Sequence, residues 1–266
     1  MSKKPKSDYA IQTVSNALRL LEMFEGEERL GVTELARRLD LHKNNVFRLL
    51  ATLEQAGYIE QCAEDDQYRL GVRCLELGAS YSDSRSLLCR ARPLLARLAA
   101  ELRETAHLGI ERDDHVVHLG GELPDQLLLT GLRLGSRLPL HCTALGKVLL
   151  AFAPDGRKEA FERERAAAGG LEARTPRTLV DRDKFRDELQ AVASLGFALD
   201  LQECELGLVS AAAPVFDASG AVVAALSVSG PVVRLGDDDL HRRIVPAVRA
   251  AAEELSRQLG FRGFGA

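Results

Sequence analysis

The sequence predicts an α+β protein of two domains joined by a helical linker. Two short helical patterns and a hairpin occupy residues 32–70, an order typical of a winged helix-turn-helix. Residues 87–102 form a long helical pattern rich in alanine and arginine. Residues 105–266 mix hairpin-joined strands with helices, which favours a mainly antiparallel sheet with helices gathered around it. At 266 residues, the chain is long enough to bury a substantial core in each domain.

The first domain is expected to contain three helices followed by a hairpin. The apolar spacing predicts helices over 14–24, 32–39 and 43–55 and strands over 58–61 and 67–70. The second and third helices are joined by the tight turn Asp40-Leu41-His42, and Gly57 ends the third helix. We expect the third helix to bury four apolar side chains: Val46, Phe47, Leu50 and Leu53.

The third helix carries side chains that are suited to contact with DNA. Asn44 and Asn45 in its first turn can bond adenine N6 and N7. Asn44 is equally suited to cap the helix, so its role is left open. Arg48 is one turn further on and suits a phosphate or a guanine, although it could instead brace a nearby acid, Glu34 or Glu54. Lys43 suits a phosphate, with the same alternative, and Arg69 in the hairpin is the expected contact from the wing.

The charge balance of this domain opposes strong binding to DNA by one copy. Residues 1–84 hold 11 Lys and Arg against 14 Asp and Glu. Because affinity for DNA without regard to sequence comes from cations that face phosphates, the cations must be sorted onto one surface. We therefore expect modest affinity from a monomer, compensated by dimerisation.

The linker and the second domain follow. We place the boundaries at 1–82 for the DNA-binding domain with the start of the linker, 83–104 for the linker helix and 105–266 for the second domain. Pro93 lies in the early turns of the linker helix, which could therefore start at residues 90–92. The expected strands are 105–112, 116–121, 127–132, 197–201, 208–215 and 222–229. The expected helices after the hairpin are 72–80, 87–102, 144–152, 155–168, 182–195 and 237–259.

Three segments of the second domain could form one pocket. Thr143 is suited to cap a helix, which would leave the backbone N–H groups of Ala144, Leu145 and Gly146 free to bind a carboxylate. Asp200 ends a strand, where it could accept from a ligand hydroxyl, hold loop N–H groups or simply form a turn. Ser227 and Ser229 alternate onto one face of a strand, although neighbouring backbone could satisfy both hydroxyls.

Three basic residues near this pocket have roles that the sequence leaves open. Lys147 could supply a countercharge, but its place one turn into the helix favours pairing with an acid on the surface. Arg133 and Arg137 lie on the glycine-containing loop LRLGSRLP before the pocket, and this loop could cover a ligand or contact another subunit.

Several segments together resemble the IclR family of bacterial transcriptional regulators over nearly the full length. In the first half these are ALRLLEMF, TELARRLDL, KNNVFRLLATLEQAGYIE and YRLGVRCLELG. In the second half they are LRLGSRLPLHCTALGKVLLAF and GFALDLQECELGLVSAAAPVFDASGAVVAALSVSGP, before a closing amphipathic helix. Asn44 and Asn45 depart from the small hydroxyl residues that are usual there, so the operator is expected to differ.

The resemblance implies a winged-helix domain, a linker used in dimerisation and a GAF-like effector-binding domain. It implies homodimers or dimer pairs that control catabolic operons in response to small organic acids, as repressor or activator. Binding of the acid is expected to change the linker or the subunit packing, and so the spacing of two DNA-contacting helices. The effector pocket is expected to be lined by the positions Ala144, Leu145, Asp200, Leu208, Ser210, Ser227 and Ser229.

Other functions are less consistent with the sequence. A metal or thiol sensor could use Cys142 and Cys204, perhaps with His141, His107 or His118, but the spacing is irregular for zinc. GxSxG, HExxH, GxGxxG and a Walker loop are absent, so an enzyme is not expected, and no cofactor is implied. A constitutive DNA-binding protein with a purely oligomerising second domain remains an alternative.

The sequence also bears on the compartment. The basic N-terminus MSKKPKSDYA is not followed by the apolar core of a signal peptide, and the longest apolar run, 222–228, is too short to cross a bilayer. The five cysteines are scattered and odd in number, which suits a reduced cytoplasm.

Overall fold

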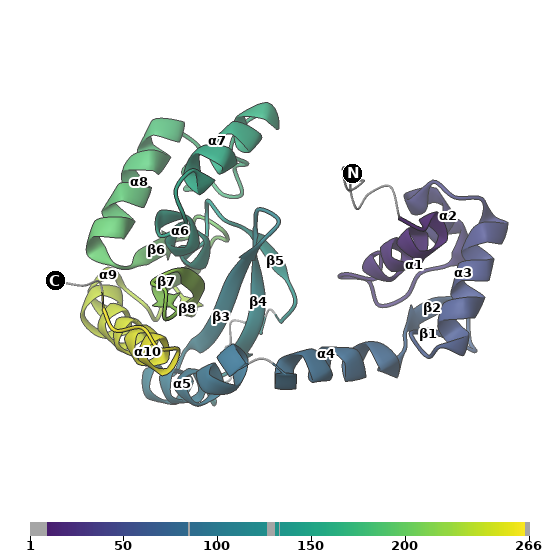
Figure 1. The fold of residues 1–266 in the computed structure, drawn as a ribbon, viewed down its shortest axis with the longest axis horizontal. Coiled ribbons are helices and arrows are strands. Elements are labelled where there is room, and N and C mark those ends of the chain that lie inside the picture. Colours follow the sequence, from purple (N-terminus) through teal and green to yellow (C-terminus); the bar gives the residue numbers. More distant parts are fainter. Residues whose placement is uncertain (1–9, 85, 127–130, 133, 264–266) are drawn as a thin grey trace, which may run out of the picture. The chain divides into compact units, whose positions relative to one another are not determined.

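The computed structural model describes residues 10–84, 86–126, 131–132 and 134–263, with the backbone alone at 79–84 and 86 (Figure 1). The chain divides after Ser84 into two compact units, 1–84 and 85–266. Residues 1–9, with the basic tail, lie outside the described part, as does Arg133.

The first unit is a helix-turn-helix with a small wing. Its elements are α1 (Gln12–Glu22), α2 (Val32–Leu39), α3 (Lys43–Gln55), β1 (Ile59–Gln61), β2 (Tyr68–Leu70) and α4 (Val72–Ser84). The core is formed by apolar side chains of the three helices and the wing, among them Leu20, Leu35, Val46, Leu50 and Ile59, which are at most 1% exposed. The wing strands are antiparallel, and a bridge from Leu30 to Tyr68 attaches the wing to the segment before α2.

The end of α3 explains how the chain enters the wing. Gly57 adopts a φ of 78° and donates its N–H to the carbonyl of Glu54, while Tyr58 donates to the carbonyl of Leu53. This pair of bonds is a Schellman motif, which a residue with a Cβ forms only with strain. The expected role of Gly57 is therefore seen in the structure.

The prediction that Phe47 of α3 is buried is wrong. Phe47 is 58% exposed, whereas Leu49 is buried at 8%. The side chains of α3 that face the core are Val46, Leu49 and Leu50, with Leu53 half-buried, and this i, i+3, i+4, i+7 stripe turns Phe47 away from the core.

The second unit contains a six-stranded antiparallel sheet with helices on both faces. Its strands are β3 (Thr105–Arg112), β4 (His115–Glu122), β5 (Arg137–Pro139), β6 (Ala198–Leu201), β7 (Leu208–Phe216) and β8 (Val222–Pro231). Their order is β5-β4-β3-β8-β7-β6, with every neighbouring pair antiparallel. The predicted α+β class, with a winged helix followed by a mainly antiparallel sheet, is confirmed.

Helices cover both faces of this sheet. The elements are α5 (Ser86–Leu102), α6 (Ala144–Ala151), α7 (Arg157–Ala167), α8 (Arg182–Leu195), α9 (Asp237–Asp239), the π-helical turn η2 (Leu240–Ile244) and α10 (Val245–Gln258). α5 and α10 lie side by side, tied by an ion pair from Arg97 to Glu254 at 2.7 Å (Figure 1). They pack on one face, while α6, α7 and α8 enclose a second apolar cluster on the other.

Several boundaries differ from the expectation. α5 begins at Ser86 and carries Pro93 inside it. The expected helix over 237–259 is three consecutive helical pieces. Of the expected strand 127–132, residues 127–130 lie outside the described part and residues 131–132 are not in a strand. The edge strand β5 was not expected.

Candidate functional site

The first turn of α3 is arranged to leave the asparagine side chains on the surface. His42 occupies the N-cap, and its ring Nδ1 accepts a hydrogen bond from the N–H of Asn44 at 3.4 Å. His42, and not Asn44, is thus the cap. Asn44 and Asn45 are both exposed and follow the cap at the positive end of the helix.

Phe47 shares the exposed face of α3 with Asn44, Arg48 and Ala51. These four positions have the spacing i, i+3, i+4, i+7, which places them on one side of a helix, and all four are exposed. An aromatic ring on this side was missed. The sequence signal that could have found it is the alternative apolar stripe through Val46, Leu49 and Leu53.

The cations of this unit differ in whether an acid neutralises them. Glu34 accepts from both Arg37 and Arg38 at 2.6 Å, and these hydrogen bonds lower the pKa of the Glu34 carboxyl to about 2. Arg48 and Lys43, by contrast, have no acid within ion-pair distance among the side chains described in residues 10–78. The alternative in which Arg48 braces Glu34 is therefore not seen, because other arginines occupy that carboxylate.

The cation of the wing, Arg69, is paired with an acid. Arg69 lies directly opposite Glu60 in the β1–β2 pair, and Nη2 of Arg69 is 3.0 Å from its carboxylate. Contact with a phosphate would have to compete with this exposed ion pair, which contributes little stability. Contact of Arg69 with DNA therefore stays a prediction, and it has less support than the contact predicted for Arg48.

A small cavity in the second unit is where the predicted effector residues meet. Strand register places Ser229 beside Ser210, Ser210 beside Asp200, and Ser227 beside His107. The N-terminus of α6 lies over this face of the sheet, and residues of both line a partly open cavity of about 40 Å³. Eight of the nine predicted residues line the cavity: Thr143, Ala144, Leu145, Asp200, Leu208, Ser210, Ser227 and Ser229.

The ninth residue, Gly146, has a packing role. A Cβ at this position would overlap the backbone of Leu140, so the close approach of α6 to that segment needs glycine. Its N–H is also occupied, because Thr143 Oγ1 accepts from it at 3.1 Å as the helix cap. The expected three N–H groups are thus reduced to those of Ala144 and Leu145, which have no acceptor within the described residues.

Asp200 supports the shape of the pocket with one carboxylate oxygen. Its Oδ1 accepts from the N–H of Glu203 at 2.7 Å and of Cys204 at 3.4 Å, which fixes the turn after β6. The side chain is buried, and burial raises the pKa of Asp200 to about 7 despite these two hydrogen bonds. Of the roles considered from the sequence, the structure shows the two local ones, holding loop N–H groups and forming the turn after the strand.

Four lining residues were not predicted for this cavity: His107, His118, Leu138 and Cys204. The rings of His107 and His118 meet edge to face with centroids 5.2 Å apart. The two histidines come from neighbouring strands β3 and β4, and only the strand register, which the sequence does not specify, brings them together.

Lys147 is buried and already paired with acids, so it does not supply a countercharge for a ligand. Its Nζ lies 2.8 Å from Glu188 and 2.7 Å from Glu203. Burial alone would lower the pKa of Lys147, but the charges of Glu203 and Glu188 more than offset it, so the pKa is raised. The expected partner acid exists, yet this pairing is in the interior and not on the surface.

Cys142 and Cys204 lie together beside the pocket. Both are buried, and a side-chain hydrogen bond to Cys204, together with burial, raises the pKa of the Cys142 thiol. A thiol held in its protonated form is a poor nucleophile and a poor metal ligand. Among the described residues, no group of three or more His, Cys, Asp or Glu could hold a metal ion.

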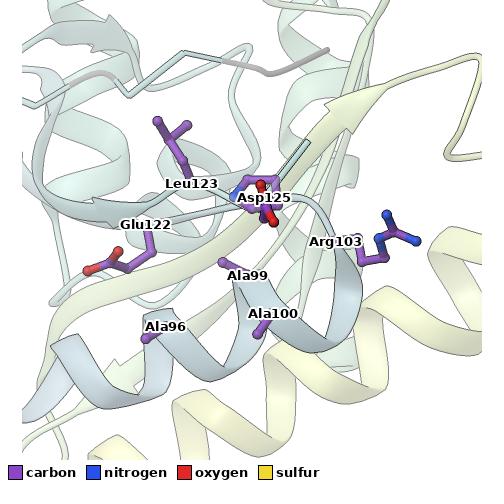
Figure 2. Close-up of a pocket in the computed structure, with 8 residues that line it drawn as sticks. Ala96, Ala99, Ala100, Arg103, Glu122, Leu123 and Asp125 are labelled. Carbon is purple, nitrogen blue, oxygen red and sulfur yellow. The ribbon is translucent and has the colours of Figure 1, made fainter. Parts of the chain in front are cut away.

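Larger hollows in this unit are lined by other residues. One of about 460 Å³ lies between α5 and the segment after β4; Figure 2 shows Ala96, Ala99 and Ala100 on α5 facing Glu122, Leu123 and Asp125. Another, of about 750 Å³, lies between the ends of α8 and α10. Neither contains the backbone N–H groups and hydroxyls that converge beneath α6.

Both halves of the chain match known family domains. Residues 13–62 match the IclR helix-turn-helix domain, and residues 79–257 match the bacterial transcriptional regulator IclR C-terminal domain. The chain belongs to the IclR family of bacterial transcriptional regulators. Membership makes the protein a DNA-binding transcriptional regulator and not an enzyme.

Individual IclR-family proteins are similar over nearly the whole chain. The glycerol operon regulatory protein of Streptomyces coelicolor is 35% identical, over 94% of this chain and 97% of its own. The crystal structure of an IclR transcriptional regulator from Alicyclobacillus acidocaldarius is 28% identical, with a TM-score of 0.85, over 95% and 100% of the two chains. An IclR homolog from Microbacterium hydrocarbonoxydans, complexed with 4-hydroxybenzoate, shares the fold at 24% identity, with a TM-score of 0.79 over 93% and 98%.

None of the described helices combines the length and the apolar character that crossing a membrane requires.

Proposed function

We propose that this protein controls a catabolic operon in response to a small organic acid bound between α6 and the sheet. The observation that carries the proposal is the convergence of eight residues, from α6, β6, β7, β8 and their loops, on one cavity. Two free N–H groups at the start of α6 suit a carboxylate, and the serine hydroxyls suit the rest of a polar ligand. The IclR homolog with 4-hydroxybenzoate makes aromatic acids a sensible class to test alongside aliphatic ones.

The size of the cavity implies that binding changes the domain. A volume of about 40 Å³ suits ordered water and not an organic acid of several carbons. An effector must therefore displace side chains of α6 or of the β6–β7 turn when it enters. That displacement is what would distinguish the bound from the free state and so shift the population of DNA-binding conformations.

Asp200 gives the proposed site a dependence on pH. A carboxylate beside an anionic ligand is repelled, whereas its protonated form can donate a hydrogen bond to the ligand. Since the pKa of Asp200 is raised to about 7, an acid effector is expected to bind more tightly at pH 6 than at pH 8.

DNA recognition is proposed to need two copies of the chain. Ile11, Val14 and Leu18 form an exposed apolar face along α1, between 52% and 67% exposed. Val72 and Leu75 at the start of α4 are exposed at 61% and 72%. Apolar faces of this extent mark protein interfaces, so we propose that these helices pair in a homodimer that acts in the bacterial cytoplasm.

Thermal unfolding in the presence of small carboxylates tests the sensing part of the proposal. A ligand at 100 times its Kd stabilises a protein by roughly 2.7 kcal/mol. We expect such a shift with at least one acid of a panel that includes 4-hydroxybenzoate, and a smaller shift in Ser227→Ala at the same ligand concentration. Ser194→Ala, on the exposed side of α8, is the matched control and should respond like the wild type.

The opposite result would favour a different function. If no acid of the panel shifted unfolding, or if Ser227→Ala responded like the wild type, sensing in this cavity would be contradicted. Operator binding without any response would then favour a constitutive regulator with an oligomerising second domain.

A further inference from the structure

Phe47 is an aromatic residue whose exposure the fold does not explain. It is 58% exposed on α3, although the core beneath it is filled by Val46, Leu49 and Leu50. No ring of the described residues stacks on it. A large aromatic side chain left in water suggests a partner that covers it.

The neighbours of Phe47 indicate what that partner is. Asn44 and Arg48 lie on the same side of the helix, and Lys43 is one turn before Phe47. Neither Lys43 nor Arg48 has an acid partner among the described side chains of residues 10–78. An apolar protein surface would leave these two cations uncompensated, whereas a duplex supplies phosphates beside base edges.

The major groove of DNA offers an aromatic ring one apolar group, the C5 methyl of thymine. We infer that Phe47 is a specificity-determining residue that packs on a thymine methyl while Asn44 or Asn45 bonds adenine nearby. This inference rests on the proposed placement of α3 in the major groove. It predicts a half-site in which at least one A·T pair is recognised through its methyl group.

Replacement of thymine by deoxyuridine tests this contact, because it removes the methyl and leaves the hydrogen-bonding edge unchanged. An operator is first selected from random duplexes by the purified full-length protein, and each thymine is then replaced in turn. We expect one position per half-site at which deoxyuridine weakens binding by about fourfold, the factor that burial of one methyl gives. In Phe47→Ala the loss at that position should vanish, and in Phe47→Leu it should be reduced.

Matched variants separate this contact from general effects. Asn44→Ala should bind less tightly yet keep the sensitivity to deoxyuridine. Val233→Ala, which truncates an even more exposed apolar side chain in the second unit, should behave like the wild type. Because Phe47 is exposed, Phe47→Ala should unfold at the same temperature as the wild type.

Different results would contradict the inference about Phe47 and the proposed function on which it rests. If the wild type selects an operator but no thymine methyl affects affinity, or if Phe47→Ala keeps the wild-type sensitivity, the inference is wrong while DNA recognition stands. If Phe47→Ala instead changes the oligomeric state and leaves base preference intact, Phe47 is covered by protein. Selection of no operator at all contradicts the proposed function itself.

Discussion

At the residue scale, Asp200 shows how a single buried carboxyl combines a structural role with a cost. Its Oδ1 holds the turn after β6, but burial makes its ionised form unfavourable and raises the pKa to about 7. The folded protein therefore binds this proton more tightly than the unfolded chain does. The resulting stabilisation is present at low pH and is lost as the pH rises from about 4 towards 7.

Asp200→Asn is expected to become more stabilising as the pH rises. Asparagine keeps an oxygen that can accept from Glu203 and Cys204 but cannot ionise. Relative to the wild type, its free energy of unfolding should increase by roughly 2–3 kcal/mol between pH 5 and pH 8. Chemical denaturation at the two pH values measures this, with the exposed Asp155→Asn as control. An equal difference at both pH values would contradict the role given to burial.

Arg48 is the residue on which DNA affinity should depend most simply. Arg48→Ala should weaken operator binding and reduce the slope of log K against log salt by about one unit, because one phosphate contact is lost. Fluorescence anisotropy over a range of salt concentrations measures both. Arg37→Ala is the matched control, since Glu34 already neutralises Arg37 in the free protein. An unchanged slope in Arg48→Ala would show that α3 is misplaced.

Single residues also show which positions could be predicted from the sequence and which could not. The exposed asparagines and Arg48 could be placed because helical spacing determines which side they occupy. Phe47 could not, since apolar spacing allows a stripe through either Phe47 or Leu49, and only packing against α1 and α2 decides between them. The sequence favours a surface ion pair for Lys147, because charge alone does not reveal that this side chain is buried when it meets Glu188 and Glu203.

At the element scale, α6 positions the proposed effector site. Thr143 caps the helix, and Gly146 lets it approach the backbone of Leu140. The sequence predicted the helix and its cap, because both are local features. The use of Gly146 for packing could not be predicted, since it depends on a segment that the chain brings back against the helix.

Gly146→Ala should destabilise the second unit. The added methyl overlaps backbone atoms, which cannot move as a flexible side chain can, so a loss of about 1–3 kcal/mol or more is expected. Gly78→Ala in α4, where a Cβ meets nothing within 4 Å, should be neutral or stabilising because alanine favours a helix. Thermal unfolding of the two variants compares them directly. A stable Gly146→Ala would mean that α6 lies further from the backbone of Leu140.

At the scale of the whole molecule, the two units have separate chemistries. The first unit has exposed cations on α3 that no acid of the described side chains neutralises, and the second contains the small polar cavity that we propose binds an acid. The order of domains could be predicted because each has its own periodic pattern. The cavity could be predicted only in part, since the two histidines that line it meet through the register of β3 and β4.

The proposed dimer is tested through the exposed face of α1. Leu18→Asp places a charge in the proposed apolar interface, so it should shift the full-length protein towards monomer and weaken operator binding at least tenfold, because two half-site contacts are no longer linked. Analytical ultracentrifugation and anisotropy measure the two effects. Leu195→Asp, at a similarly exposed position on α8, is the control. A Leu18→Asp dimer with normal affinity would place the interface elsewhere.

The coupling between the two units is tested most directly by titrating the operator complex with an acid that stabilises the protein. We expect such an acid to change the operator affinity of the wild type at least fivefold, and Ser227→Ala to need a higher concentration of the acid for the same change. A carboxylate that binds the wild type tightly and leaves operator affinity unaltered would contradict the account.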